Sequence, residues 1–561
     1  MQRGDLMAVA AILAGYALAL ALMPIQHNFS YVDDWVFFRA AERIVDGQGF
    51  VPPDFGQMSL VSHAYWGALF GSLLGMNLTV ATAATMVMGL VACLSFYAIL
   101  RLLGFTPGLS GLGVALMAFN PFFVTLSYSF MTEVTFVAFM LLSCLCYLLG
   151  IRERTTVDGG RWTVDGENTK RETRNASMGI HRLSSTVYRL SSIAWLAAGG
   201  LFAALAFLTR QFGLALPVAV LVWLVVARKA SWGRAAAVMG LPVAAVVGYY
   251  ALVGGGGSTF SDSQSRNEIM GLFTSLDAWT HRLKSLSFAL PMIGLAVPLF
   301  LKVRWWVPAG LLAVVAGAVV AIQGNRRDES VALSAHVAEP FDIGQPFRLE
   351  FTPFWWVAAA ITVWAVFRLA EQAWPGLRAL IGGRRRIEPV EFFYLAGIFL
   401  LAGTFLARME IYVRYLLPVI PFVIIAGLKQ LEGRSVRQLA PTLAVLVITG
   451  AVAIALHLDD YSFLKTRWQA GHDLVAQGVP YTQINNGFTW DSYYLYDQAL
   501  REVGSRDLET LGAETLPEKI IDPVYVIGVN QPEGYTTVRT YNYFSLLDGM
   551  TNREIYVMRR N

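Results

Sequence analysis

Charged residues are scarce in this sequence. They make up 15% of its 561 residues, whereas soluble domains average about 25%. Hydrophobic residues make up 55% of the chain, and the mean hydropathy is +0.51. This composition excludes an ordinary soluble domain and predicts an integral membrane protein.

Cysteines and clustered basic residues are also few. The three cysteines, Cys93, Cys144 and Cys146, all lie within apolar runs, which argues against a disulfide framework or a zinc site. The formal net charge is +4 and the basic residues are spread over short loops, so no nucleic acid is expected among the partners. The sequence also lacks a GxxxxGK phosphate-binding loop.

Long apolar runs are abundant instead. Hydropathy predicts about thirteen membrane-spanning helices. The first, over residues 7–24, we interpret as a retained anchor and not as a signal peptide, because more spans follow. The others are expected near residues 78–100, 108–126, 132–150, 191–208, 211–227, 236–253, 286–301, 305–323, 353–370, 391–407, 415–428 and 440–457.

The distribution of Lys and Arg predicts the orientation. With the N-terminus inside, the inner loops collect the basic residues of 101, 152–189, 228–234, 302–304, 368–386 and 429–437. The first loop, residues 25–77, then lies outside, and two short stretches within it, Trp35–Ala41 and Ala64–Leu74, are expected along the membrane surface.

The same orientation divides the chain into two domains. A membrane domain is expected over residues 1–457, with a cytoplasmic, poorly ordered insert over 151–190. Glycines Gly254–Gly257 open an outer loop suited to a mobile lid. The tail, residues 458–561, alternates apolar and polar residues in "KIIDPVYVIGVN" and "TNREIYVMRR", which predicts a small α/β domain outside the membrane.

Charges at the outer ends of spans are the candidate site residues, because ionisable groups near a bilayer are costly and usually functional. They are Asp33 and Asp34, Glu133, Arg210, Arg408 and Arg414. All are expected on one side of the membrane, so they could converge on one cavity. Carboxylates beside arginines would suit a phosphorylated lipid and a nucleophile that must lose a proton.

Each candidate also has a purely structural interpretation. Ser30 and Asp33 have the spacing of a capping box, and Glu133 could complement the dipole of its helix. The arginines could extend toward the membrane interface. His63 could be an interfacial hydrogen-bonding residue.

Several motifs together resemble those of the GT-C membrane glycosyltransferases. They are "YVDDWVFFRAAERIVDGQGFVPP" after the first span, "SHAYWGALFGSLLG", "FMTEVTF" at the start of a later span, and "VRYLLPVIPF". The sequence is most similar to the branch that contains protein O-mannosyltransferases and the aminoarabinose transferase of lipid A, glycosyltransferase families 39 and 83. The resemblance covers about the first 430 residues, is strongest in the first 150 and implies an all-α polytopic GT-C fold.

The resemblance implies roles for individual residues. Asp33 falls on the catalytic acid of the first outer loop, with Asp34 beside it where Glu is common, and Glu133 matches a second acid. Arg414 and Tyr415 match the Arg-Tyr pair before the Pro-rich span, and His63 stands where Pro is frequent. Adjacent helical residues point about 100° apart, so only one of the two aspartates should be the base, and we assign Asp33.

The expected function is that of an inverting glycosyltransferase in a bacterial inner (cytoplasmic) membrane. It would transfer a sugar from a polyprenyl-phosphate donor to the hydroxyl of a lipid, glycan or protein acceptor on the outer face. No cofactor is predicted with certainty, and a divalent metal stays open. The alternatives are a transporter or flippase of lipid-linked glycans, which often shows internal repeats, and a surface-polysaccharide polymerase or ligase with key loops around 254–284 or 323–350.

Overall fold

The computed structural model describes residues 3–25, 29–31, 33–53, 58–151, 192–253, 389–407, 413–429, 431–433, 436–503, 516–546 and 551–561. The predicted spans near 286–301, 305–323 and 353–370, the insert 152–190 and the glycine run 254–257 lie outside these residues. What was predicted for them stays a prediction.

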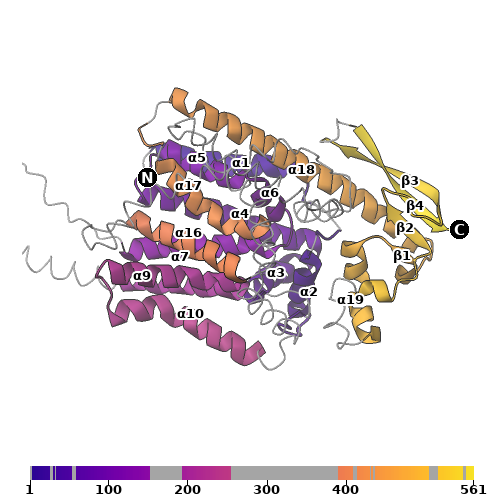
Figure 1. The fold of residues 1–561 in the computed structure, drawn as a ribbon, viewed down its shortest axis with the longest axis horizontal. Coiled ribbons are helices and arrows are strands. Elements are labelled where there is room, and N and C mark those ends of the chain that lie inside the picture. Colours follow the sequence, from indigo (N-terminus) through magenta and orange to yellow (C-terminus); the bar gives the residue numbers. More distant parts are fainter. Residues whose placement is uncertain are drawn as a thin grey trace, which may run out of the picture.

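The chain forms a helical membrane bundle with a small sheet domain at one end (Figure 1). Its helical elements are α1 (Arg3–Leu22), α2 (Asp34–Val45), α3 (Val61–Leu74), α4 (Leu78–Leu102), α5 (Pro107–Ala118), α6 (Pro121–Ser127), α7 (Thr132–Ile151), the helix Ser192–Thr209, η1 (Gln211–Leu214), α9 (Ala215–Val226), α10 (Trp232–Val253), α16 (Pro389–Ala407), η2 (Val413–Val419), α17 (Ile420–Lys429) and α18 (Val436–Ala476). The predicted multi-pass membrane protein is confirmed by these apolar helices.

Within the described residues, five helices are long and apolar enough to cross a membrane, namely α1, α4, α7, Ser192–Thr209 and α10. They match predicted spans to within a few residues. The regions predicted as spans over 211–227 and 415–428 are each split into a 3-10 helix and a shorter α-helix. Pro418 and Pro421 interrupt the regular hydrogen bonding of the second region.

The span predicted over 108–126 is a bent pair, α5 and α6, with an angle of 66° between the two helices. Pro121 is the first residue of α6 and has no backbone N–H to continue α5. Asn120 takes an extended conformation before it and caps α6 by accepting a hydrogen bond from the Phe122 N–H, 3.0 Å away. Hydropathy cannot detect this break because both helices are apolar.

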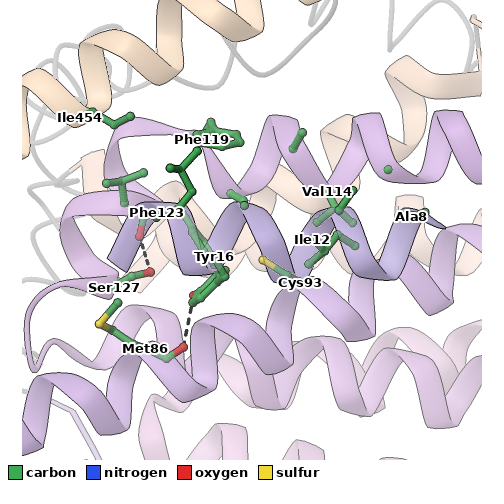
Figure 2. Close-up of a pocket in the computed structure, with 18 of the residues that line it drawn as sticks. Ala8, Ile12, Tyr16, Met86, Cys93, Val114, Phe119, Phe123, Ser127 and Ile454 are labelled. Atoms are coloured by element: carbon green, nitrogen blue, oxygen red, sulfur yellow. Dashed lines mark hydrogen bonds between the residues drawn. The ribbon is translucent and has the colours of Figure 1, made fainter. Parts of the chain in front are cut away.

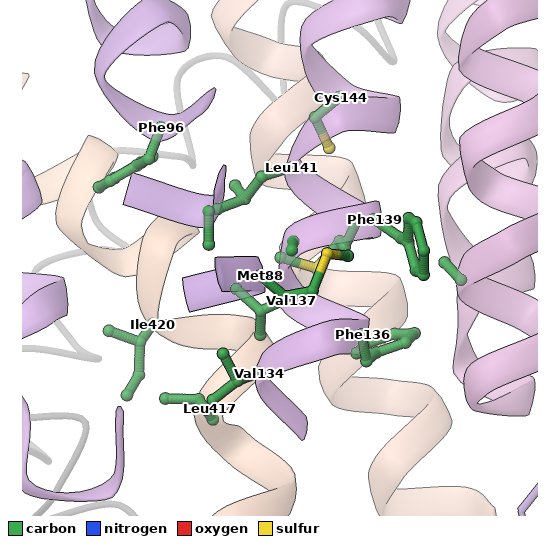
Figure 3. Close-up of a cluster of buried hydrophobic side chains, with 14 of the residues drawn as sticks. Met88, Phe96, Val134, Phe136, Val137, Phe139, Leu141, Cys144, Leu417 and Ile420 are labelled. Atoms are coloured by element: carbon green, nitrogen blue, oxygen red, sulfur yellow. The ribbon is translucent and has the colours of Figure 1, made fainter. Parts of the chain in front are cut away.

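Helix α7 lies at the centre of the bundle. Most of its side chains are buried, among them Val134, Val137 and Leu141. Figure 3 shows them beside Met88 and Phe96 of α4 and Leu417 of η2. The start of α7, which carries Glu133, is therefore held in place by helices from distant parts of the sequence.

Helices α2 and α3 lie between the membrane helices and the sheet domain (Figure 1). They contain the two stretches predicted to lie on the membrane surface, and with 12 and 14 residues both are shorter than the ~20 residues of a membrane span. Together they bring the first loop over one end of the bundle.

The tail forms a four-stranded sheet of order β1-β2-β4-β3. The strands are β1 (Ile484–Asn485), β2 (Tyr525–Gly528), β3 (Tyr535–Ser545) and β4 (Thr551–Arg560), accompanied by η3 (Tyr481–Gln483), α19 (Phe488–Val503) and η5 (Pro517–Lys519). β2 and β4 lie in the two segments whose alternation predicted strands, so the predicted small α/β domain is confirmed. β3, which pairs antiparallel with β4, was not predicted.

The boundary predicted between residues 457 and 458 lies inside α18, which continues without a break to Ala476. Hydropathy marks where a helix becomes polar, but not where it ends. Phe29 and Tyr31 of the first loop also pack into the core of the tail beside Phe463 and Trp468 of α18. The two predicted domains thus share a helix and part of a core.

The orientation is a testable prediction. Because Lys and Arg accumulate on one side, a topology reporter fused after Gly47 or near Gly487 should report the outer side. One near Glu167 should report the cytoplasm. An external signal at Glu167 would invert the orientation and contradict the outer-face function derived from it.

Candidate active site

Two carboxylates and two arginines meet at the end of the bundle where α2 begins. Arg210 donates a hydrogen bond to Oε1 of Glu133 over 2.7 Å, and Arg414 donates one to Oδ2 of Asp33 over 2.9 Å. Nε of Arg414 also lies 3.5 Å from Oε1 of Glu133, which joins the two ion pairs. Side chains up to 381 positions apart thus form one cluster, as the sequence predicted for these four residues.

Exposure differs across this cluster. The side chain of Glu133 is 0% exposed, whereas that of Asp33 is 17% exposed. Charges this deeply buried require close partners because of their desolvation cost. Asp33 is therefore the more accessible of the two carboxylates.

The ring of Tyr415 lies against both arginines. Its centroid is 5.0 Å from the guanidinium carbon of Arg210 and 5.5 Å from that of Arg414. A planar guanidinium that stacks on an aromatic face makes a favourable cation–π contact. Tyr415 and Arg414 belong to η2, whose seven-residue 3-10 helix is longer than the short runs usual for this conformation.

Arg210 lies at a tight turn between two membrane helices. The helix Ser192–Thr209 ends there, and Arg210 has the extended φ of −149°. A Cβ on Gly213 would lie 2.3 Å from the backbone N of Phe207, so only glycine allows this close return of the chain. The turn directs Nε of Arg210 to Oγ1 of Thr132, 2.7 Å away.

Asp33 occupies the N-cap position of α2 but makes no side-chain capping hydrogen bond. Its carboxylate instead contacts Arg414. Ser30 donates to Asp34, not to Asp33. The capping-box interpretation of Asp33 is therefore wrong.

Asp34 ties the first loop to α7. Its carboxylate accepts hydrogen bonds from Ser30 Oγ, from the Tyr31 N–H over 2.9 Å and from the Phe130 N–H over 3.3 Å. Burial raises the pKa of Asp34 from 3.8 to about 7, and these hydrogen bonds offset only part of that rise. The side chain is fully buried, so it can orient the loop around Asp33.

The raised pKa of Asp34 predicts a pH-dependent stability. Below about pH 4 the carboxyl is protonated in both states, and between about pH 4 and 7 only the unfolded chain ionises. Stability should therefore fall by up to about 4 kcal/mol over this range and stay lowered above it. Asp34→Asn should flatten this slope in detergent unfolding curves, whereas Asp46→Asn, at an exposed position, should not. Parallel curves for wild type and Asp34→Asn would contradict the shift.

His63 belongs to α3 and is fully buried. Its Nδ1 is 2.9 Å from Oγ1 of Thr135 and its Nε2 is 3.1 Å from the Phe130 carbonyl oxygen, so α3 is joined to the start of α7. Burial lowers the pKa of its imidazole to about 4, which keeps the ring neutral near pH 7. This geometry fits the hydrogen-bonding interpretation, and direct contact with substrate stays a prediction.

A strained residue precedes α3. Leu60 has a φ of 61°, in the left-handed region that disfavours side chains, and it is fully buried. Its N–H donates to the Thr209 carbonyl oxygen over 3.2 Å, and Ser59 Oγ donates to that of Phe207 over 2.6 Å. These bonds fix the start of α3 against the turn that carries Arg210, and strain of this kind is common at functional sites.

The remaining predicted site residues have different outcomes. Arg210 and Arg414 are each 5% exposed, so the interpretation that they extend toward the interface is wrong. Arg408 lies outside the described residues. In the part of the chain that the structure describes, no group of three or more His, Cys, Asp or Glu residues could hold a metal ion.

Sequence reasoning missed the contacts between the tail and α2. Arg39 of α2 forms an ion pair with Asp497 of α19 and donates to the Tyr493 carbonyl oxygen. The ring of Trp35 lies 5.0 Å from that of Tyr496. The sequence offers no signal for contacts over 458 positions, so this support of the loop that carries Asp33 became visible only in the structure.

Comparison with known proteins gives partial matches. The family model of dolichyl-phosphate-mannose-protein mannosyltransferases matches residues 61–160. This stretch is similar to protein mannosyltransferases. The predicted resemblance is thus confirmed over the segment that carries His63 and Glu133. No curated protein matches the chain.

Two solved structures are similar in outline. ArnT from Cupriavidus metallidurans in the apo state has 14% identity and a TM-score of 0.46, over 98% of this chain and 97% of that one. ArnT from the same organism bound to undecaprenyl phosphate has 12% identity and a TM-score of 0.43, over 99% and 97%.

Proposed function

We propose that this protein is an inverting glycosyltransferase that takes a sugar from a polyprenyl-phosphate donor and transfers it to an acceptor hydroxyl at the outer face of a bacterial cytoplasmic membrane. The observation that carries the proposal is the buried cluster of Asp33, Glu133, Arg210 and Arg414 at one end of the bundle. It combines a reachable carboxylate with two arginines in a part of the chain where isolated charges would be costly.

The donor follows from the position of the site. A site outside the membrane has no supply of cytoplasmic nucleotide sugars, and the sequence carries no GxxxxGK loop. The match of residues 61–160 to transferases that use a lipid-phosphate sugar supports the same donor class. The arginines fit the donor phosphate, because guanidinium groups bind phosphate oxygens in pairs.

Asp33 is assigned as the general base. Its carboxylate accepts a hydrogen bond from Arg414 over 2.9 Å. A donor phosphate that binds Arg414 would compete with this ion pair and free Asp33 to accept the acceptor's proton. The acceptor oxygen then forms a bond to the anomeric carbon as the bond to the lipid phosphate breaks, and the arginines stabilise the departing phosphate. A single displacement inverts the anomeric centre.

The other site residues position these groups. Glu133 and Thr132 fix the guanidinium of Arg210, and Tyr415 supports both arginines. Asp34 holds the loop that carries Asp33, so in this mechanism neither Asp34 nor Glu133 takes the proton. A role for Arg408 in substrate binding stays a prediction.

Reconstituted protein tests the function directly. Vesicles that contain the purified protein should release polyprenyl phosphate from at least one radiolabelled polyprenyl-phosphate sugar when a lipid, glycan and protein extract supplies the acceptor. A transporter would move the donor across the bilayer without cleaving it. Transbilayer movement with no cleavage of hexose or pentose donors would contradict the transferase and favour that alternative.

A further inference from the structure

An apolar cavity of about 540 Å³ lies along α1 (Figure 2). Its walls come from α1, α4, α5 and α6, with Ile454 of α18 at one end. The volume is in the range of ligand sites and far above that of an ordinary packing defect.

The cavity is continuous with the surface that α1 turns to the bilayer. Met7, Leu18 and Leu22 line it and are themselves 66%, 59% and 52% exposed. Within the described part of the chain, no residue of α1 is fully buried. Hydrocarbon from the bilayer therefore has direct access along the helix.

The described side chains that line the cavity suit a hydrocarbon chain and not a charged lipid headgroup. None of the described residues that line the cavity carries a charged side chain. The hydroxyl of Tyr16 donates to the Met86 carbonyl oxygen over 3.2 Å, and Ser127 Oγ donates to that of Phe123 over 2.6 Å, as Figure 2 shows. The arginines suited to a phosphate, Arg210 and Arg414, are not part of this lining.

We propose that this cavity is a binding site for an acyl chain of a bilayer phospholipid. A site without headgroup recognition is filled by the most abundant chains around it, because occupancy follows concentration. The donor's chain would instead be anchored by its phosphate at the arginine cluster. The inference is independent of the transferase function.

The occupied cavity would support the back of the candidate active site. Tyr128 lines its outer end, and the ring of Tyr128 lies 4.5 Å from that of His457. His457 stacks at 6.4 Å on Tyr31, two residues before Asp33. An acyl chain beside Tyr128 thus completes the packing of the wall that holds the first loop.

Glycines in the wall make the proposal testable. A Cβ added to Gly15 of α1 or Gly111 of α5 would meet no atom within 4 Å. The double variant Gly15→Leu/Gly111→Leu should therefore narrow the cavity without disturbing the fold. Gly240→Leu is the matched control, because Gly240 of α10 is exposed, has equally open surroundings and does not line the cavity.

The probe is phosphatidylglycerol with a diazirine in its acyl chain, mixed into vesicles with the full-length protein and irradiated. Peptides from α1 and α5 should be labelled more than those of α10. The double variant should lower this labelling about tenfold, since each leucine displaces methylene groups of the bound chain, and Gly240→Leu should not. Unfolding curves should show the double variant as stable as wild type and less sensitive to delipidation.

Three results would overturn the proposal. They are equal labelling of α10 and α1, labelling that survives in a folded double variant, and displacement of the probe by equimolar polyprenyl phosphate, which would assign the cavity to the donor chain. If the double variant does not fold, the wild-type labelling map and the competition with polyprenyl phosphate still decide the question.

Discussion

Asp33→Asn should lower the rate of sugar transfer by about 10²–10⁴-fold, the range typical for loss of a general base. Asparagine keeps the size of the side chain and can still accept a hydrogen bond from Arg414, but it cannot take a proton. The structure shows no capping bond from Asp33, so the helix should tolerate the change. Transfer from a radiolabelled polyprenyl-phosphate sugar measures the loss. Donor binding should not weaken, because the variant removes the charge that competes with the donor phosphate for Arg414.

The control for this prediction is Asp46→Asn at the other end of α2. Asp46 follows the last residue of the helix and is exposed, so its variant should transfer at the wild-type rate. Near wild-type transfer by purified Asp33→Asn would contradict the assignment of Asp33 as the general base. Asp34→Asn and Glu133→Gln would then be the next variants to assay.

Arg210→Lys and Arg414→Lys should each lower transfer by about 10- to 100-fold, which corresponds to one lost charge-assisted hydrogen bond. Lysine keeps the positive charge but offers one ammonium group instead of a planar fork. Arg210 uses two nitrogens at once, on Thr132 and on Glu133, and lysine cannot reproduce that geometry. Initial rates over a range of donor concentrations would separate weaker donor binding from slower chemistry.

Removal of the charge should have a different effect, on stability. Arg210→Met leaves the fully buried Glu133 without its closest partner, a change that costs about 3–5 kcal/mol for buried pairs. The loss should fall near the lower value, because Nε of Arg414 is 3.5 Å from the same carboxylate oxygen.

Arg101→Lys is the control for the two lysine variants, Arg210→Lys and Arg414→Lys, since Arg101 pairs with Asp5 over 2.6 Å outside this cluster. Wild-type turnover in both lysine variants would count against phosphate binding by these arginines.

Much of the membrane domain could be predicted from sequence because hydropathy reports directly on burial in lipid. The convergence of Asp33, Glu133, Arg210 and Arg414 could also be predicted, since threaded spans bring helix ends to one side of the membrane. Which groups pair could not. That Glu133 binds Arg210 while Asp33 binds Arg414 depends on the turn at Gly213 and on η2, neither of which follows from an apolar pattern.

The acidic pair shows the same limit. Ser30 and Asp33 have the capping-box spacing, yet Asp34 receives the hydrogen bond from Ser30. Local spacing predicts local partners, whereas Phe130, a third partner of Asp34, lies 96 positions away. The contact of Arg39 with Asp497 could not be predicted for the same reason, because its two partners lie 458 positions apart.

Helix α18 has a mechanical consequence. Its 41 residues form a strut about 60 Å long that begins beside the membrane helices and ends in the core of the tail (Figure 1). A continuous helix resists bending, so the sheet domain cannot swing freely on a flexible linker. The tail also contacts α2 through the ion pair of Asp497 with Arg39. A displacement of the sheet would therefore be transmitted to the helix that follows Asp33.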